Sequence, residues 1–368
     1  MAASVKFCSV VGARPQFVKA GMVSRALRQR TGVTDVLVHT GQHYDANMSD
    51  VFFREFALPS PDHHLGVGSG LHGAQTAQML VGLERILLHE RPAAVIIYGD
   101  TNSTLAAAVA AAKLHIPVAH VEAGLRSFNR VMPEEINRLV ADAISDVLFA
   151  PSSDAIRRLR HEGHPDDRIV WSGDVMYDAA LMTAGLARDS STILADLGLA
   201  EHAYVLATVH RAENTDDPVR LESIIGALAM LSERYPVVLP LHPRTRAALV
   251  RTGLMDGAAA TLRLVEPVGF VDMVRLEMGA HAVATDSGGV QKEAFFHGVP
   301  GFILRDETEW VELVEAGWNL LVPPGDARAM ADVMLSWTGE RRPITPFGDG
   351  HASELIVDSL LARYGSPA

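Results

Sequence analysis

Short apolar runs, rich in β-branched residues, alternate with longer amphipathic segments along almost the whole chain. Such runs are typical of buried strands, and the segments between them have the period and length of helices. Repeated strand–helix–strand units predict parallel sheets joined by right-handed crossovers. The pattern predicts strands at Val5–Val11, Val33–His39, Ala94–Tyr98, Val118–Val121, Val147–Ala150, Val205–Val209, Val237–Leu241, Leu262–Val265, Ala282–Ala284 and Gly301–Leu304.

This alternation is interrupted near the middle of the chain. The stretch Trp171–Ala200 contains no strong strand pattern and opens on the sequence WSGDVMYD. A chain of 368 residues has room for two domains at roughly 150 residues each. We therefore predict an α/β fold with two Rossmann-like domains, residues 1–172 and 173–352. The segment 353–368 has a helical pattern with no strand after it, and we expect it to join the first domain.

Composition excludes several classes of protein. Asp and Glu outnumber Lys and Arg by 44 to 32, which argues against a nucleic-acid partner because such binding depends on neutralising phosphates. The single cysteine, Cys8, excludes a disulfide scaffold and a cysteine zinc cluster. The longest Ala-rich stretch is broken by Lys113 and Pro117, so it is too short to span a bilayer. We expect a soluble, cytoplasmic protein with no membrane partner and no metal site.

Ionisable and small polar residues crowd the positions that follow the predicted strands. Ligands of open parallel sheets bind beyond the carboxyl ends of the strands. These positions are therefore the candidate site. They include Arg14, Lys19, Asp100, Glu122, His210, His242, Asp286, Ser287, Gly288, Gly289 and Arg305.

One of these segments has the features of an anion site. Ser287-Gly288-Gly289 directly precedes the helical pattern VQKEAFFHG, and a helix start with small residues offers backbone N–H groups to an anion. Glu293, about one turn later, could accept hydrogen bonds from ribose hydroxyls or simply lie on the surface. A literal G-x-G-x-x-G match at Gly68–Gly73 follows a polar loop instead of a strand, so we interpret it as a loop.

The charged residues of the candidate site can also be explained by ordinary structural roles. Arg14 and Lys19 could bind a phosphate or a carboxylate, or could be solvated residues at a helix start. Asp100 and Glu134 are residues that helix N-termini favour in any protein. Glu122, in the small-residue context HVEAGLRS, has no such explanation. His210 could carry a proton or contact a phosphate, or could be an ordinary strand-end histidine.

Ten short motifs occur in order from the first strand to about Leu321. They read GARPQFVK, HTGQHYD, YGDTNSTLAAA, HVEAGLRS, MPEEINR, GDVMYDA, TVHRAEN, PLHPR, TDSGGVQKEA and RDETEW. In these motifs the chain resembles the non-hydrolysing UDP-N-acetylglucosamine 2-epimerases. The resemblance implies a GT-B-like fold with two Rossmann-like domains around a cleft, a homodimer, and interconversion of UDP-GlcNAc and UDP-ManNAc without a cofactor.

The resemblance also implies roles for individual residues. The catalytic residues of the family fall on Asp100, Glu122, Glu134 and His210. The basic residues that contact UDP fall on Arg14 and Lys19, the diphosphate loop on Ser287, Gly288 and Gly289, and the ribose-binding glutamate on Glu293. We expect His242 and Arg305, which follow predicted strands, to help bind the substrate.

The chain also departs from better-known members of that family. They carry an arginine that contacts the nucleotide where this chain has Trp310, and an Arg-Gln pair of an allosteric site where this chain reads HGAQTA. Activation by UDP-GlcNAc is therefore open. The DETEW sequence also resembles branches that act on UDP-2,3-diacetamido-2,3-dideoxyglucuronate, so the sugar is open as well.

Elementary chemistry indicates how such a site would work. The C2 hydrogen of the sugar becomes acidic only once the C1–O bond to UDP begins to break, so elimination to a 2-acetamidoglucal and re-addition of UDP would invert C2. Asp100 and Glu134 would transfer the protons and Glu122 would stabilise positive charge, although the sequence leaves open which is acid and which base. The alternatives are a hydrolysing epimerase that releases ManNAc, a GT-B glycosyltransferase and a nucleotide-sugar sensor.

Overall fold

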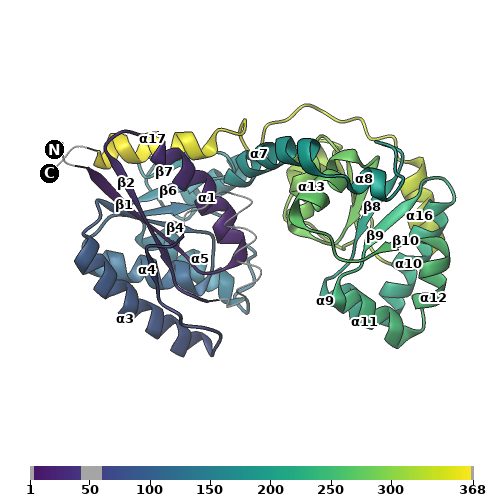
Figure 1. The fold of residues 1–368 in the computed structure, drawn as a ribbon, viewed down its shortest axis with the longest axis horizontal. Helices are drawn as coiled ribbons and strands as arrows, with labels where there is room; N and C mark the ends of the chain where they lie inside the picture. Colours follow the sequence, from purple (N-terminus) through teal and green to yellow (C-terminus); the bar gives the residue numbers. More distant parts are fainter. Residues whose placement is uncertain (1–3, 43–59, 366–368) are drawn as a thin grey trace. The chain divides into compact units, whose positions relative to one another are not determined.

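A computed structural model describes residues 4–42 and 60–365 of the chain (Figure 1). The chain forms two compact units, the first comprising residues 1–179 and 345–368 and the second residues 180–344. Each unit is built on one sheet in which neighbouring strands run parallel. The α/β class with parallel sheets, predicted from the alternating pattern, is confirmed.

The sheet of the first unit has seven strands in the order β3-β2-β1-β4-β5-β6-β7. The strands are β1 (Val5–Val11), β2 (Val33–His39), β3 (His63–His64), β4 (Ala94–Tyr98), β5 (Val118–Val121), β6 (Val147–Ala150) and β7 (Ile169–Trp171). The helices are α1 (Arg14–Arg28), α3 (His72–Glu90), α4 (Asn102–Lys113), α5 (Pro133–Ile144), α6 (Ser153–His161), α7 (Val175–Ser190) and α17 (Ala352–Tyr364). Helix α7 continues into the second unit after Ala179.

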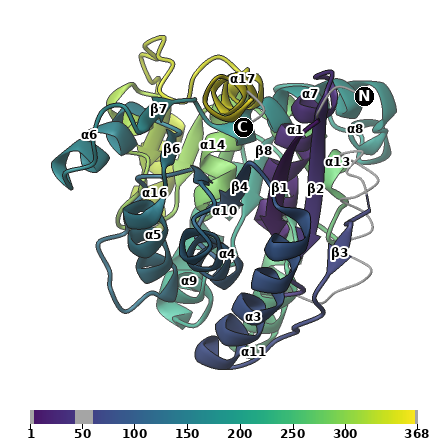
Figure 2. The ribbon, with the colours of Figure 1, turned by 90° about the vertical axis from the view of Figure 1, so that its left-hand side faces the viewer.

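Helices cover both faces of this sheet. Helices α1 and α17 lie on one face, and α3, α4 and α5 lie on the other (Figures 1 and 2). A strand covered on both faces reads as a continuous apolar run, and β4 is buried over its whole length. The small side chains of α4, five of them buried alanines, let this helix pack closely between α3 and α5.

The second unit has a six-stranded sheet in the order β10-β9-β8-β11-β12-β13. The strands are β8 (Val205–Thr208), β9 (Val237–Pro240), β10 (Arg263–Val265), β11 (Ala282–Thr285), β12 (Gly301–Ile303) and β13 (Asn319–Leu321). The helices are α8 (Ile193–Asp196), α9 (Ala212–Thr215), α10 (Pro218–Ser232), α11 (Pro243–Thr252), α12 (Met255–Thr261), α13 (Phe270–Gly279), α14 (Gly288–Phe296), α15 (Val311–Glu315) and α16 (Ala327–Ser336).

Alternate residues of the central strands of this unit enter different cores. Val205 and Ala207 of β8 pack with α10 and α16, whereas Leu206 packs with α8, α13 and α14. This alternation follows from the period of two along a strand. The central strands are therefore buried on both sides, and only their ends remain free for polar chemistry.

All ten predicted strands are present, with ends that differ by at most one residue. Three further strands, β3, β7 and β13, were not predicted. Each has only two or three residues and lies at an edge of its sheet, so it is too short to produce a recognisable pattern. Within residues 4–42 and 60–365, the longest apolar helices fall short of what a membrane crossing requires.

Helix α17 returns to the first unit and lies beside α1 (Figure 1). The backbone amides at its N-terminus donate hydrogen bonds to Asp178 of α7. The Asp178 carboxylate accepts from the backbone N of Ala352 at 3.0 Å and from the backbone N of Ser353 at 2.7 Å. It also accepts a hydrogen bond from the Ser353 hydroxyl at 2.6 Å. The Asp178 side chain is buried, and burial raises its pKa. A carboxylate from another helix thus attaches α17 to the first unit.

Replacing Asp178 with alanine should destabilise the first unit, because three buried donors lose their acceptor. We expect a loss of about 1–3 kcal/mol in the free energy of unfolding, measured by denaturant titration. Asp358→Ala is the matched control, since it removes only an exposed ion pair of the same helix with Arg30 and should cost less than about 0.5 kcal/mol. Equal losses in both variants would contradict this role of Asp178.

Candidate functional site

Two candidate carboxylates lie at the carboxyl edge of the first sheet. Asp100 follows β4 and Glu122 follows β5, and these strands are paired. The backbone of Glu122 has φ +72°, a left-handed conformation that costs a non-glycine residue about 1–3 kcal/mol. Strain of this kind is concentrated at functional sites.

The Glu122 carboxylate contacts the ammonium of Lys19 from α1. Both side chains are largely buried, at 15% and 8% exposure. A Cβ on Gly99 would lie 3.2 Å from Oε2 of Glu122 and 3.6 Å from Nζ of Lys19, so glycine in this turn leaves room for the pair. Lys19, which we predicted as a UDP contact, thus neutralises a carboxylate in the first unit.

Asp100 has a cationic partner as well, which the sequence analysis did not identify. Nη1 of Arg138, from α5, donates to Oδ2 of Asp100. The same guanidinium pairs with Glu135 at 2.9 Å. Asn137 donates to the backbone oxygen of Asp100 at 2.8 Å, so two consecutive residues of α5 hold the turn that follows β4.

The charges of the two other candidate carboxylates, Glu122 and Glu134, both act on Asp100, and we call these three residues the carboxylate cluster. Burial raises the pKa of Asp100 above its ordinary value, and the negative charges of Glu122 and Glu134 raise it further. Arg138 and Lys19 oppose this shift. Glu134, in the first turn of α5, is exposed. The first unit therefore holds a carboxyl group that retains a proton more readily than a free aspartate does.

A buried amide network supports this cluster. Asn137 donates to Asn102 at 3.3 Å, Asn102 donates to Gln75 at 2.7 Å, and Gln75 donates to the backbone oxygen of Gly68 at 2.7 Å. Nδ1 of His72 lies 3.0 Å from the Asn102 amide. Residues 68–71 are therefore a loop attached to the carboxylate cluster, as their position after a polar stretch indicated, whereas His72 and Gly73 begin α3.

In the second unit, the predicted anion loop is a helix start. The Ser287 hydroxyl caps α14 by accepting from the backbone N of Val290 at 3.5 Å. The Trp310 indole N–H donates to the Gly288 carbonyl at 2.9 Å, and the Lys292 ammonium lies 4.3 Å from the centre of the Trp310 ring. Trp310, which replaces an arginine of better-known relatives, thus fixes the loop while a lysine supplies positive charge nearby.

His210 lies beside this loop, because β8 and β11 are paired. Its ring is 39% exposed, and Nδ1 lies 3.5 Å from Oδ1 of Asp286, which is fully buried. The ring of His242 lies 5.5 Å from that of His210. Burial lowers the pKa of His242, and the positive charges of His210 and Arg244 lower it further.

Arg305 and Glu293 are the remaining predicted contacts of this unit. Arg305 is buried and pairs with Glu309 at 2.8 Å and with Glu213 at 3.5 Å, so it organises the loop that carries Trp310. Glu293 lies in α14, and its charge adds to the effect of burial in raising the pKa of Glu277. Arg14 begins α1, but its side chain lies outside the described part of the structure, as do His43–Asp45 of the HTGQHYD motif.

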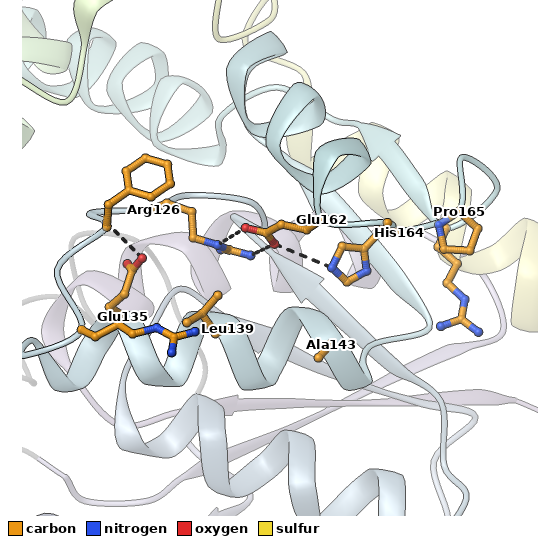
Figure 3. Close-up of a pocket in the computed structure, with 11 residues that line it drawn as sticks. Arg126, Glu135, Leu139, Ala143, Glu162, His164 and Pro165 are labelled. Carbon is orange, nitrogen blue, oxygen red and sulfur yellow. Dashed lines mark hydrogen bonds and ion pairs between the residues drawn. The ribbon is translucent and has the colours of Figure 1, made fainter.

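The first unit also has a hollow of about 690 Å³ along α5 (Figure 3). Glu135, Leu139 and Ala143 contribute one face of the helix. Nη2 of Arg126 lies 2.5 Å from Oε2 of Glu162 and 2.7 Å from Oδ2 of the buried Asp142, so it forms an ion pair with both. The other lining residues are Phe128, Arg130, Gly163, His164, Pro165 and Arg168. The hollow borders the Glu135–Arg138 pair but includes none of the three clustered carboxylates.

Comparison with known proteins identifies the family. Residues 25–361 match the sequence profile of the family described as UDP-N-acetylglucosamine 2-epimerase. The chain belongs to this family. The resemblance of the chain to UDP-N-acetylglucosamine 2-epimerases, which we inferred from the ten motifs, is confirmed.

Relatives of this epimerase-family chain match it over nearly their full length. A UDP-2,3-diacetamido-2,3-dideoxy-D-glucuronate 2-epimerase of Pseudomonas aeruginosa is 49% identical, covering 97% of this chain and 99% of the relative. A UDP-N-acetylglucosamine 2-epimerase of Methanocaldococcus jannaschii is 41% identical, with the same coverage. The crystal structure of the M. jannaschii UDP-GlcNAc 2-epimerase with UDP-GlcNAc and UDP has a TM-score of 0.83 at 40% identity, covering 97% of this chain and 100% of that one. The expected GT-B-like fold is confirmed.

The structure adds three groups to the site of this epimerase-family chain. Arg138 and Asn137 lie in the MPEEINR motif and were not selected, whereas Asp286 in TDSGG was recognised at a strand end but was given no role. Only the structure shows that they contact Asp100 and His210. Across residues 4–42 and 60–365, no cluster of three or more His, Cys, Asp or Glu side chains could hold a metal ion.

The raised pKa of Asp100 makes a prediction about stability. Unfolding returns the pKa of Asp100 to its ordinary value near 3.8. Above that pH, ionising Asp100 therefore costs more free energy in the native state than in the unfolded state, which lowers stability. Asp100→Asn removes this cost and should therefore raise the melting temperature at about pH 7.5, even though the Arg138 pair is lost. The gain should shrink as the pH falls, because the native Asp100 takes up its proton at a higher pH than the unfolded chain does. Calorimetry at a series of falling pH values checks the prediction, and a gain independent of pH would contradict it.

Proposed function

We propose that this chain is a non-hydrolysing UDP-sugar 2-epimerase that inverts C2 by eliminating UDP and adding it back. The observation that supports this proposal most strongly is the cluster of Asp100, Glu122 and Glu134, in which Asp100 has a raised pKa. A glycosyltransferase has no need of three carboxylates in this unit. An epimerase needs proton transfer on both faces of C2 and negative charge near a developing cation.

The carboxylates divide this work according to their surroundings. Glu122, held by Lys19, stabilises the positive charge that develops on the sugar when the C1–O bond breaks. Asp100, partly buried and with a raised pKa, exchanges a proton at C2 on one face. Glu134, exposed at the start of α5, exchanges a proton on the other face.

The departing diphosphate needs an anion site throughout the reaction. The turn of Ser287, Gly288 and Gly289 forms this site at the start of α14 through the backbone N–H groups of the two glycines, with the His210 ring beside it. Because UDP leaves as an anion and must return, these groups hold it while the glucal is protonated. Glu293 binds the ribose hydroxyls.

Four further residues complete the substrate site. Arg14 and Lys19 contact UDP from the first turn of α1 and one turn beyond it. His242 and Arg305 act from the neighbouring strand ends, with Arg305 holding the loop through Glu309. The active protein is a cytoplasmic homodimer, as the resemblance implies.

UDP-GlcNAc is the substrate we propose first, with UDP-ManNAc as its product. The M. jannaschii relative, which is 41% identical to this chain, is named a UDP-N-acetylglucosamine 2-epimerase. UDP-2,3-diacetamido-2,3-dideoxyglucuronate is a specific second candidate, because the P. aeruginosa relative named for that sugar is 49% identical. Both sugars carry the 2-acetamido group next to C1, so one mechanism serves either.

An NMR time course with each UDP-sugar tests the proposal. We expect the C2 epimer to accumulate to equilibrium with UDP still attached, and turnover to fall at least about 100-fold in Asp100→Asn, because an amide cannot carry the proton. The control is Asp358→Asn, a change on the exposed face of α17. Free sugar and UDP as products would indicate a hydrolysing enzyme. No reaction with either sugar unless an acceptor is added would indicate a transferase.

A further inference from the structure

The turn that carries His210 is organised around one buried side chain. The Asp286 carboxylate, which is fully buried, accepts from the backbone N of His210 at 3.0 and 3.1 Å, from the backbone N of Arg211 at 3.0 Å, and from the side-chain amide of Asn214 at 3.1 Å. Asp286 directly follows β11 and His210 follows the paired strand β8 by two residues, so the sheet places them side by side.

The two carboxylate oxygens have different surroundings. Oδ2 accepts from the backbone N of His210 and of Arg211 and from the Asn214 amide. Oδ1 accepts only from the His210 backbone N and lies 3.5 Å from Nδ1 of the His210 ring. Oδ1 therefore has capacity for one more hydrogen bond, and the nearest ring nitrogen is on its side. Hydrogen bonds at active sites are often this long before a ligand binds.

We propose that Asp286 is a positioning residue that holds His210 with its proton on Nδ1, so that Nε2 on the opposite, exposed edge of the ring serves the diphosphate. This inference rests on the proposed function for the role of the diphosphate, but the arrangement of His210 can be tested without it. A carboxylate beside one ring nitrogen fixes the tautomer and the orientation of a histidine.

The tautomer has a direct chemical consequence. With the proton on Nδ1, Nε2 is free to accept one proton from solvent water, and the imidazolium then donates an Nε2–H hydrogen bond to an oxygen of the departing diphosphate. When UDP returns to C1, this hydrogen bond is lost and the Nε2 proton returns to solvent. The other neighbours of the ring do not offer this control, because the His242 ring lies tilted with its centre 5.5 Å away and the Arg211 guanidinium lies 3.9 Å from Glu213 and 3.8 Å from Glu309.

Asp286→Asn separates this role from simple support of the turn. The amide oxygen of asparagine will occupy the position of Oδ2, where three donors converge, which places its NH2 group at the position of Oδ1. An N–H donor then faces Nδ1, so the ring should move its proton to Nε2. Thr285→Val is the matched control. It removes the hydroxyl contacts with Thr208 and with the backbone N of Ser287 in the same turn but leaves the carboxylate in place.

Nitrogen-15 NMR of histidine-labelled protein measures the tautomer directly. His210→Asn identifies the His210 signals among those of the 16 histidines. We expect a protonated Nδ1 and a bare Nε2 in the parent protein and in Thr285→Val, and the reverse in Asp286→Asn. Turnover in Asp286→Asn should fall about 10- to 100-fold, with the dissociation constant for UDP changed less than about threefold.

The possible outcomes separate this inference from the proposed function. An unchanged His210 tautomer in Asp286→Asn, or the same change in Thr285→Val, would overturn the role of Asp286 even if the protein epimerises UDP-sugars. A parent protein that epimerises neither sugar would overturn the proposed function, while the NMR result would still decide how His210 is held. A loss of UDP binding equal to the loss of turnover would show that Asp286 only supports the turn.

Discussion

The burial of a charged carboxylate beside other carboxylates is the constraint on which the site in the first unit depends. Burial raises the pKa of Asp100 at the edge of the sheet, and the charges of Glu122 and Glu134 raise it further. Such an arrangement persists only if cations and packing compensate for it. Lys19 and Arg138 supply the cations, and a left-handed backbone at Glu122 keeps its carboxylate in place. This arrangement therefore lowers the stability of the folded chain, and such costs are common at sites whose chemistry needs a carboxyl group with a shifted pKa.

In the proposed mechanism the second unit has the opposite task, because it would hold an anion that repeatedly leaves and returns. It offers the backbone amides at the start of α14 and a histidine whose backbone is fixed by Asp286. Trp310 locks the Gly288 carbonyl, so the amides of this turn keep their direction. Fixed dipoles bind a diphosphate without making its departure as costly as a permanent ion pair would.

The sequence predicted strands and strand-end chemistry well, because buried strands are continuous apolar runs and a parallel sheet collects their ends at one edge. It could not predict which residues pair there. Lys19, which we expect at UDP, also contacts Glu122, and Arg138, which was not selected, contacts Asp100. Asp286 was recognised as a strand-end residue but was given no role. Pairing depends on how α1 and α5 pack on the sheet, and no local pattern in the sequence records that.

The most direct measurement is epimerisation in D2O, followed by mass spectrometry and proton NMR of the product. If a carboxyl group that exchanges with solvent removes the C2 hydrogen and a second one delivers it on the other face, each turnover places deuterium at C2. The account predicts one deuterium at C2 of the product from the first turnover onward. Epimerisation with the original hydrogen retained at C2 would contradict the elimination route and the roles of all three carboxylates.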